Sequence, residues 1–225
     1  MPMNEQKGNM YEFISHTWNP IRGECHHECA YCYMKGRFGG PLRLDQKEVK
    51  TDLRENNIIF VGSSTDMWAT NVPHDWILKV LEHCNKYPDN TYIFQTKNPH
   101  RFNDTLFIGK YPPWTMLGTT IESNRTYGGT KAPGPFARAV DMFSARTRCA
   151  KTFVTIEPIM DFDLADMVHV IGTARPDKVF IGADSKGHHL PEPTAEKILS
   201  LEALLKRKSI EVIRKPNLNR LLKEA

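Results

Sequence analysis

The chain has 225 residues, 40% of them hydrophobic and 25% charged, and 30 Lys and Arg against 26 Asp and Glu give a net charge of +4. This length and composition exclude a disordered chain, a collagen-like repeat and a small disulfide scaffold, and favour one domain over residues 1–225. The first eight residues are polar, and no run approaches the ~18 apolar residues of a membrane span. We therefore expect a cytoplasmic protein that does not enter a membrane.

Three of the five cysteines lie within eight residues, in a predicted loop over residues 17–36. The sequence there includes Cys25-His-His-Glu-Cys29-Ala-Tyr-Cys32. An odd cysteine count and a clustered trio favour metal ligation by reduced thiolates over a disulfide framework. Three thiolates would leave one iron of a [4Fe–4S] cube without a protein ligand, and an iron with an open position can bind a substrate.

A zinc site is the main alternative interpretation of this trio. The three cysteines and either His26 or His27 would complete a Cys₃His set, and with a basic tail this would make a nucleic-acid-binding module without catalysis. Structural zinc usually takes two separated ligand pairs, whereas one loop supplies the trio here. Cys84 or Cys149 as a fourth ligand would give a closed electron-transfer cluster, but both lie in helical patterns, where a packed thiol is expected.

Strands alternate with helices from residue 58 onwards. The pattern predicts strands over 58–61, 91–96, 115–121, 152–156, 178–181 and 210–213, and helices over 75–86, 135–148, 163–171 and 194–208. Such alternation indicates right-handed βαβ units and a parallel sheet. The sequence therefore predicts an α/β fold.

Polar residues stand two apart at the ends of three predicted strands, so both members of each pair project to the same side. The pairs are Gln95/Lys97, Thr120/Glu122 and Thr155/Glu157, and the turn 62–66 follows the first of the predicted strands. In a parallel barrel the C-terminal strand ends form the active face. These groups are expected to converge on one rim, although each of them singly is equally well explained as a cap of the following turn.

The C-terminal segment 201–225 carries the excess positive charge of the chain. It contains seven basic and three acidic side chains, while the remaining residues hold 23 of each sign. Such a segment is typical of a solvated helix face, and it also suits the phosphate backbone of a nucleic acid. A DNA contact through this segment is therefore one of two interpretations.

The cysteine trio, with Tyr31 before its last member, resembles the signature of the radical S-adenosylmethionine (radical SAM) superfamily. Other segments resemble a compact phage-associated family of these enzymes, which is related to spore photoproduct lyase, a repair enzyme for a thymine dimer in DNA. These segments are 17–20, 60–63, 95–97, 118–122, 155–158 and 179–182. The resemblance implies a partial (β/α)6 TIM-like barrel, which agrees with the predicted strands.

The resemblance implies two cofactors, a [4Fe–4S] cluster and SAM. In the superfamily the open iron chelates SAM, and one electron cleaves SAM to methionine and a 5′-deoxyadenosyl radical that abstracts a substrate hydrogen. A flavodoxin- or ferredoxin-type reductant is also implied, with the host cytoplasm as the location if a phage encodes the chain. The substrate implied is a modified thymine in DNA, such as an amino-acid-decorated thymidine, rearranged by an isomerase or lyase. A free small molecule or a peptide is the alternative.

The resemblance also implies site residues. Cys25, Cys29 and Cys32 would ligate the cluster, and Tyr31 would pack near the adenine of SAM. In place of the family's Gly-Gly-Glu motif, which holds the methionyl amino group, this chain has Ser63, Ser64, Thr65 and Asp66. The other expected SAM contacts are Gln95, Lys97, Thr120, Glu122, Glu157, Ile181 and Gly182.

Within this second set, Lys97 would be the point charge opposite the SAM carboxylate, and Ile181 and Gly182 would meet the adenine edge. His188 and His189 follow the last core strand and could touch substrate, but a structural role or a position facing solvent is expected for each. Trp68 is the best candidate for stacking on a base, although a core position is the commoner role of tryptophan.

Overall fold

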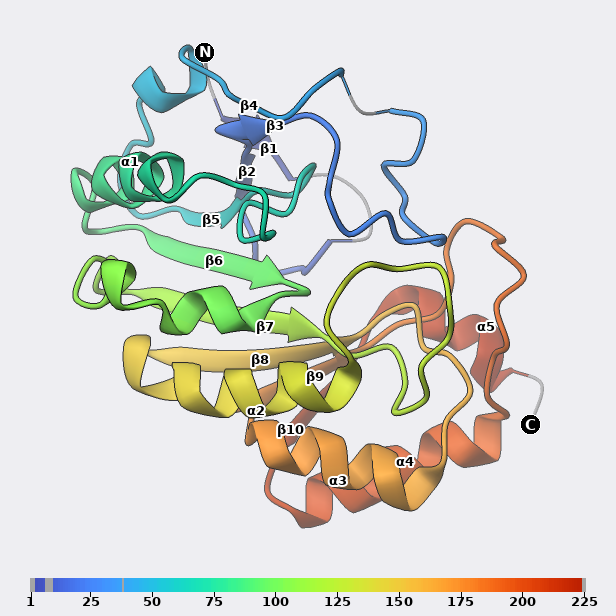
Figure 1. Ribbon diagram of the computed structural model, residues 1–225. Helices are drawn as coiled ribbons and strands as arrows, with labels where there is room; N and C mark the ends of the chain where they lie inside the picture. Colours follow the sequence, from blue (N-terminus) through green and yellow to red (C-terminus); the bar gives the residue numbers. More distant parts are fainter. Residues whose placement is uncertain (1–2, 7–9, 38, 224–225) are drawn as a thin grey trace.

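The predicted sheet is present and has eight strands. The computed structural model describes residues 3–6, 10–37 and 39–223. The strand order is β1-β2-β5-β6-β7-β8-β9-β10, and every neighbouring pair is parallel except β1 and β2 (Figure 1). In that order the strands span Asn4–Glu5, His16–Trp18, Ile58–Val61, Thr91–Thr96, Thr115–Thr120, Lys151–Ile156, Lys178–Ile181 and Glu211–Arg214. A separate two-stranded sheet pairs β3 (Ile21–Arg22) with β4 (Arg43–Leu44).

The longer helices cover the outer face of this sheet, and the short last helix lies at the end to which the strand arrows point (Figure 1). They are α1 (His74–Asn85), α2 (Pro135–Ala145), α3 (Leu164–Ala174), α4 (Ala195–Arg207) and α5 (Asn219–Leu222). Short 3₁₀ turns span Glu48–Lys50, Pro99–Asn103, Thr105–Phe107, Arg146–Arg148 and Pro216–Leu218. The ends of the helices follow local chemistry, because Pro135 begins α2 and the Thr194 hydroxyl accepts a hydrogen bond from Lys197 N at the start of α4. Within the described residues no helix has the length and apolar character needed to cross a membrane.

The predicted α/β fold with a parallel sheet is confirmed. The strands from β5 to β10 match the predicted ranges to within one residue at each end, and the four predicted helices match to within three residues. The strand β2 was not predicted, since three residues are too few to show alternation. It pairs in parallel with β5. The cysteine loop therefore starts at the C-terminal end of a barrel strand, like the other loops of the rim.

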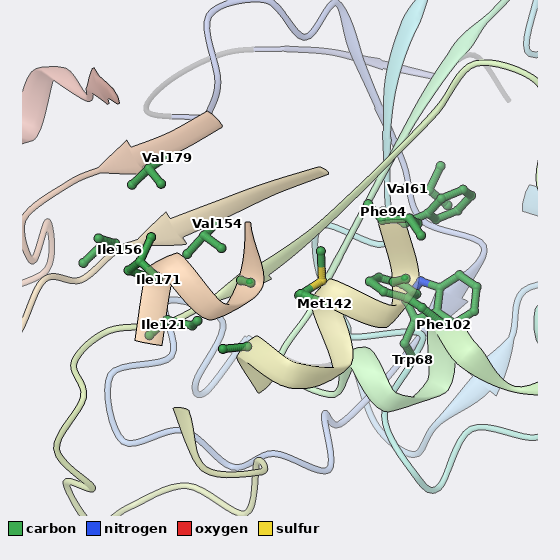
Figure 2. Close-up of a cluster of buried hydrophobic side chains, with 14 of the residues drawn as sticks. Val61, Trp68, Phe94, Phe102, Ile121, Met142, Val154, Ile156, Ile171 and Val179 are labelled. Atoms are coloured by element: carbon green, nitrogen blue, oxygen red, sulfur yellow. The ribbon is translucent and has the colours of Figure 1, made fainter. Parts of the chain in front are cut away.

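The outer face of the sheet packs on the helices. Val61, Phe94, Val154 and Ile156 of the strands are buried in one continuous cluster with Trp68, Phe102, Met142 and Ile171 (Figure 2). Trp68 is fully buried and packs edge-on against Phe94, with ring centroids 5.6 Å apart. Trp68, the best candidate for stacking on a base, is therefore a core residue instead, and it is not among the residues that line the cavity described below.

The inner face of the sheet forms a second core, because alternate residues of a strand point to opposite faces. Phe60, Ile93, Phe153 and Phe180 lie on this face, and Tyr11 from the N-terminal segment packs among them. The Tyr11 ring lies 6.2 Å from that of Phe60 on β5 and 4.6 Å from that of Phe180 on β9, so the sheet must curl to bring these strands together. The curl makes the sheet a partial barrel with an aromatic floor.

Candidate functional site

A cavity of about 700 Å³ lies at the C-terminal ends of the parallel strands. Its lining comes from the cysteine loop, the turn 62–66, the ends of β6, β7 and β8, and the loop after β9. The structure brings together there most of the predicted site residues: Cys25, Cys29, Tyr31, Cys32, Ser63, Ser64, Thr65, Asp66, Gln95, Lys97, Thr120 and Glu157. Glu122, Ile181 and Gly182 do not line it.

The donor set of the cysteine loop suits a metal cluster. All three thiols are free and border the same cavity. Burial, together with the nearby charge of Asp66, raises the pKa of Cys25 to about 11, so this thiol keeps its proton unless a metal replaces it. In the described part of the chain, no three His, Cys, Asp or Glu side chains are arranged to hold a single metal ion. Three thiolates on one loop are donors of the kind that iron–sulfur clusters take.

The turn 62–66 holds the cysteine loop in place. The hydroxyls of Ser63 and Ser64 both donate to Asn19 Oδ1, at 3.1 and 3.0 Å, and Ser64 N donates to the same oxygen at 2.8 Å. The Thr65 hydroxyl donates to Gly23 O at 2.7 Å. The side chains of Ser63, Ser64 and Thr65, which are among those expected to contact SAM, are thus engaged with the protein itself. Asn19, whose side-chain oxygen accepts three of these hydrogen bonds, was not predicted as a site residue.

Asp66 joins the cysteine loop to the ends of two strands. Its Oδ2 accepts hydrogen bonds from His27 Nε2 at 2.8 Å, from the Thr96 hydroxyl at 2.8 Å and from Lys97 N at 3.0 Å. Burial by itself would raise the pKa of Asp66, but the bonds from His27 and from the end of β6 outweigh it and lower the pKa. The other ring nitrogen of His27, Nδ1, is buried without a hydrogen-bond partner. Asp66 therefore acts as a carboxylate that fixes the loop.

A second buried carboxylate, Glu122, lies behind the cavity at the end of β7. Its Oε1 is 3.1 Å from Lys97 Nζ and accepts a short hydrogen bond from the Tyr31 hydroxyl, while its Oε2 lies 2.8 Å from Arg138 Nη1. Burial would raise the pKa of Glu122, but the charges of Lys97 and Arg138 and the Tyr31 bond together lower it to about 2. Glu122 thus positions Lys97 and Tyr31.

Arg138 was not predicted, although the sequence contains a signal for it. It lies on α2 among the buried positions Pro135, Ala139, Met142 and Ala145, and it is itself only 3% exposed. A charged residue on the apolar stripe of a predicted helix needs a buried partner. Arg138 also donates to two backbone carbonyls, those of Thr120 and Pro133, both at 2.6 Å.

The free energy of unfolding is expected to fall as pH drops from about 4.5 to about 2, because the lowered pKa of Glu122 stabilises the fold only while this carboxylate is ionised. The contribution is complete above the ordinary pKa near 4.5 and amounts to roughly 3 kcal/mol. Urea unfolding of wild type and Glu122→Gln across this range measures it. The difference between the two proteins should shrink with acid; a constant difference would contradict the assignment.

The inner wall of the cavity is a polar network above the aromatic floor. The Tyr11 hydroxyl donates to Gln95 Oε1 at 2.6 Å and makes a short bond with the Thr155 hydroxyl, and Gln95 Nε2 donates to Thr120 Oγ1 at 2.9 Å. Lys215 Nζ lies 5.0 Å from the centre of the Tyr11 ring. Tyr11 was not predicted, because only the curl of the sheet brings the N-terminal segment to this wall.

The C-terminal segment closes the cavity beside β8 and β9. Lys215 makes a short ion pair with Glu157, and Asn217 Nδ2 donates to the other oxygen of Glu157 at 2.8 Å. A Cβ at Gly182 would lie 2.7 Å from Glu157 Oε1, so this glycine makes room for the pair. The backbone N and O of Gly182 bond to Ile156 O and Ile159 N. The structure thus places Ile181 and Gly182 under this cluster rather than at the cavity wall.

The comparisons with known proteins agree with this architecture. Residues 9–195 match the family described as "Protein of unknown function (DUF5131)", and no curated protein matches. A cysteine-to-alanine mutant of spore photoproduct lyase with dinucleoside spore photoproduct has a TM-score of 0.67 at 11% identity, over 95% of this chain and 80% of that chain. A double mutant with bound AdoMet and dinucleoside spore photoproduct has a TM-score of 0.58 at 13% identity, over 90% of this chain and 64% of that chain. The chain has the fold of these structures, a partial TIM-like barrel, and it belongs to the DUF5131 family.

Proposed function

We propose that this protein is a radical SAM enzyme, with residues 1–225 forming one radical SAM domain and Cys25, Cys29 and Cys32 holding a [4Fe–4S] cluster. The observation that carries the proposal is the position of these thiols: one loop at the end of β2 brings all three to a cavity at the C-terminal rim of a partial barrel. Cluster and SAM together would supply one-electron cleavage of SAM and abstraction of a substrate hydrogen. The protein would position the cofactors and the substrate, provide charged groups that bind them, and exclude water from the cavity.

The residues around the cavity divide this work between them. Lys97 presents a positive charge at the end of β6 and is held by Glu122, 3.1 Å away, and by the Tyr31 ring, whose centre is 5.3 Å from Nζ. It suits the carboxylate of SAM. Gln95, Thr120 and Glu157 face the same space and offer hydrogen bonds to a ribose. The aromatic floor around Tyr11 keeps water from the inner end, which protects a reactive intermediate.

The zinc alternative is the weaker of the two. Structural zinc usually takes two separated pairs of ligands, whereas one loop supplies all three cysteines here. In a [4Fe–4S] cluster each cysteine thiolate binds a different iron, so the three sulfur atoms need not point to one common centre.

For the substrate we propose a modified thymine nucleotide in DNA, for example an amino-acid-decorated thymidine in phage DNA. The likeness to a lyase that was solved with a dinucleoside photoproduct supports this class. A duplex base would have to be flipped out to reach the cavity, at a cost of a few kcal/mol. A flavodoxin- or ferredoxin-type reductant in the cytoplasm would supply the electron. A free small molecule or a peptide is the second candidate.

The test is incubation of the iron-reconstituted enzyme with SAM, a reductant and DNA, followed by mass spectrometry of the digested nucleosides. The proposal expects 5′-deoxyadenosine whose yield rises with the decorated DNA, together with a change in the decorated nucleoside. Unmodified DNA is the matched control. Equal 5′-deoxyadenosine with both DNAs and an unchanged nucleoside would reject DNA as the substrate, while a colourless, zinc-loaded protein would reject the radical SAM assignment itself.

Lys97→Ala is expected to keep the cluster but weaken SAM binding by about 10- to 100-fold, since charge-assisted hydrogen bonds contribute about 1.5–3 kcal/mol. Equilibrium dialysis of labelled SAM against the iron-loaded variant measures the effect. Lys79→Ala, at an exposed position of α1, is the control and should bind SAM normally. If Lys97→Ala binds SAM as wild type does, Lys97 does not contact SAM.

A further inference from the structure

The mouth of the cavity has one lip formed by residues that follow the last cysteine. Tyr33 and Met34 line the cavity, and Lys35 and Arg37 come next and are exposed. Backbone hydrogen bonds from Lys35 N to Cys32 O at 3.0 Å and from Arg37 N to Met34 O at 2.8 Å fold this stretch into consecutive turns. The two cations therefore stay next to the residues that line the mouth.

The second lip is the loop after β9, which borders the same cavity. Asp184 accepts hydrogen bonds from the backbone N–H groups of Lys186, at 3.0 Å, and of His188, and Gly187 turns the chain with a φ of +69°. Arg220 Nη2 donates to Asp184 O at 3.1 Å and so anchors the loop to α5. The loop holds Lys186 at the mouth, exposed and among the lining residues. Figure 1 shows both loops on the side of the molecule to which the strand arrows point.

The charges of these lips differ from those of the C-terminal segment, where the sequence pattern suggested a DNA contact. Within the described residues, no carboxylate pairs with Lys35, Arg37 or Lys186. In the C-terminal segment, by contrast, Arg214 pairs with Glu202 at 2.5 Å, and Lys215 and Arg220 make short ion pairs with Glu157 and Glu192. Three of the seven basic side chains of the segment are therefore neutralised within the fold.

Of the four remaining cations of the segment, Lys223 directly follows α5, and the other three lie at the end of the barrel opposite the cavity. Lys206, Arg207 and Lys208 are exposed, but they come just before β10, which runs parallel to β9. They therefore lie at the N-terminal edge of the sheet, whereas the cavity opens at the C-terminal edge. A DNA strand bound there would not bring a base to the cavity.

We infer that the two lips, with Lys35 and Arg37 on one side and Lys186 on the other, bind the phosphate backbone of the DNA strand whose nucleotide enters the cavity. This inference rests on the proposed function. The phosphates on either side of a flipped nucleotide must stay at the mouth, because the backbone connects them to it. Tyr33, which is 49% exposed between the cavity and Lys35, offers an aromatic face to a neighbouring base.

The experiment is fluorescence anisotropy of a short labelled oligothymidylate with the full chain over a range of salt concentrations. The triple variant Lys35→Gln, Arg37→Gln, Lys186→Gln should reduce the slope of log affinity against log salt by about 2, since each phosphate contact on a single strand contributes about 0.7. At about 0.1 M salt this is a loss of roughly 100-fold in affinity. The matched control, Lys206→Gln, Arg207→Gln, Lys208→Gln, removes equal charge from the other edge and should leave slope and affinity unchanged.

Equal losses in both triple variants, or a loss in the control alone, would overturn the inference. A second outcome would also overturn it: the lip variant binds the oligonucleotide normally, flavodoxin reduces it more slowly than wild type, and dithionite reduces both proteins at the same rate. The lips would then bind an acidic protein and not DNA. The binding assay needs neither reductant nor SAM cleavage. A wild type that cleaves SAM without binding the oligonucleotide therefore refutes the lips alone, whereas one that binds through the lips without cleaving SAM refutes the proposed function alone.

Discussion

Replacing Cys29 by alanine is expected to abolish iron binding and SAM cleavage together. Cys29 is buried, at 8% exposure, and it lines the cavity together with Cys25 and Cys32. Two remaining thiolates leave two irons of a cube without protein ligands. Iron content and electron paramagnetic resonance of the reduced protein measure the first loss, and 5′-deoxyadenosine formation measures the second.

The control for this prediction is Cys149→Ala. The Cys149 thiol lies outside the cavity lining and donates to Lys151 O at 3.1 Å. The variant should keep its iron, its colour and its SAM cleavage. If it lost the cluster instead, Cys149 would be the fourth ligand of a closed electron carrier, and the proposed chemistry would have no open iron. A Cys29→Ala protein with a full complement of iron would exclude the trio as the cluster site.

The fold was predictable where the sequence carries a local pattern. Strands β5, β6 and β9 have the predicted bounds because short apolar runs end at a clear turn, such as Gly62 after β5. The two-residue β1 and the three-residue β2 have no such pattern and form through pairing with their neighbours. The curl of the sheet was likewise implied only by the family resemblance.

The residues of the candidate site likewise fall into two groups, those that a local sequence pattern predicts and those that it does not. The cysteine trio is visible in sequence because its three members are close neighbours, and the rim residues are visible because each ends a strand. Arg138, Lys215 and Asn217 reach the site from α2 and from the C-terminal segment, 16 to 60 residues from their carboxylate partners in sequence. No local pattern identifies such partners. The same carboxylates are predicted to contact SAM, and in the structure each of them also pairs with a protein cation.

Arg138→Ala is expected to destabilise the protein by about 3–5 kcal/mol, the cost of removing one partner from a buried ion pair. The variant leaves Glu122 Oε2 without its cation and strips two backbone carbonyls, those of Thr120 and Pro133, of a donor. Lys97 still neutralises Oε1, so the fold should survive with reduced stability. Urea unfolding at neutral pH measures the loss.

Two comparisons separate the ion pair from the general effect of removing an arginine. Arg146→Ala, in the exposed turn directly after α2, should change stability by less than about 0.5 kcal/mol. Adding Glu122→Gln to Arg138→Ala should cost less than the sum of the two single changes, because the second change removes the charge that the first left unpaired. A loss below about 1 kcal/mol for Arg138→Ala, or strict additivity in the double variant, would mean that solvent reaches Glu122 and that the carboxylate is not the buried anchor for Lys97 and Tyr31.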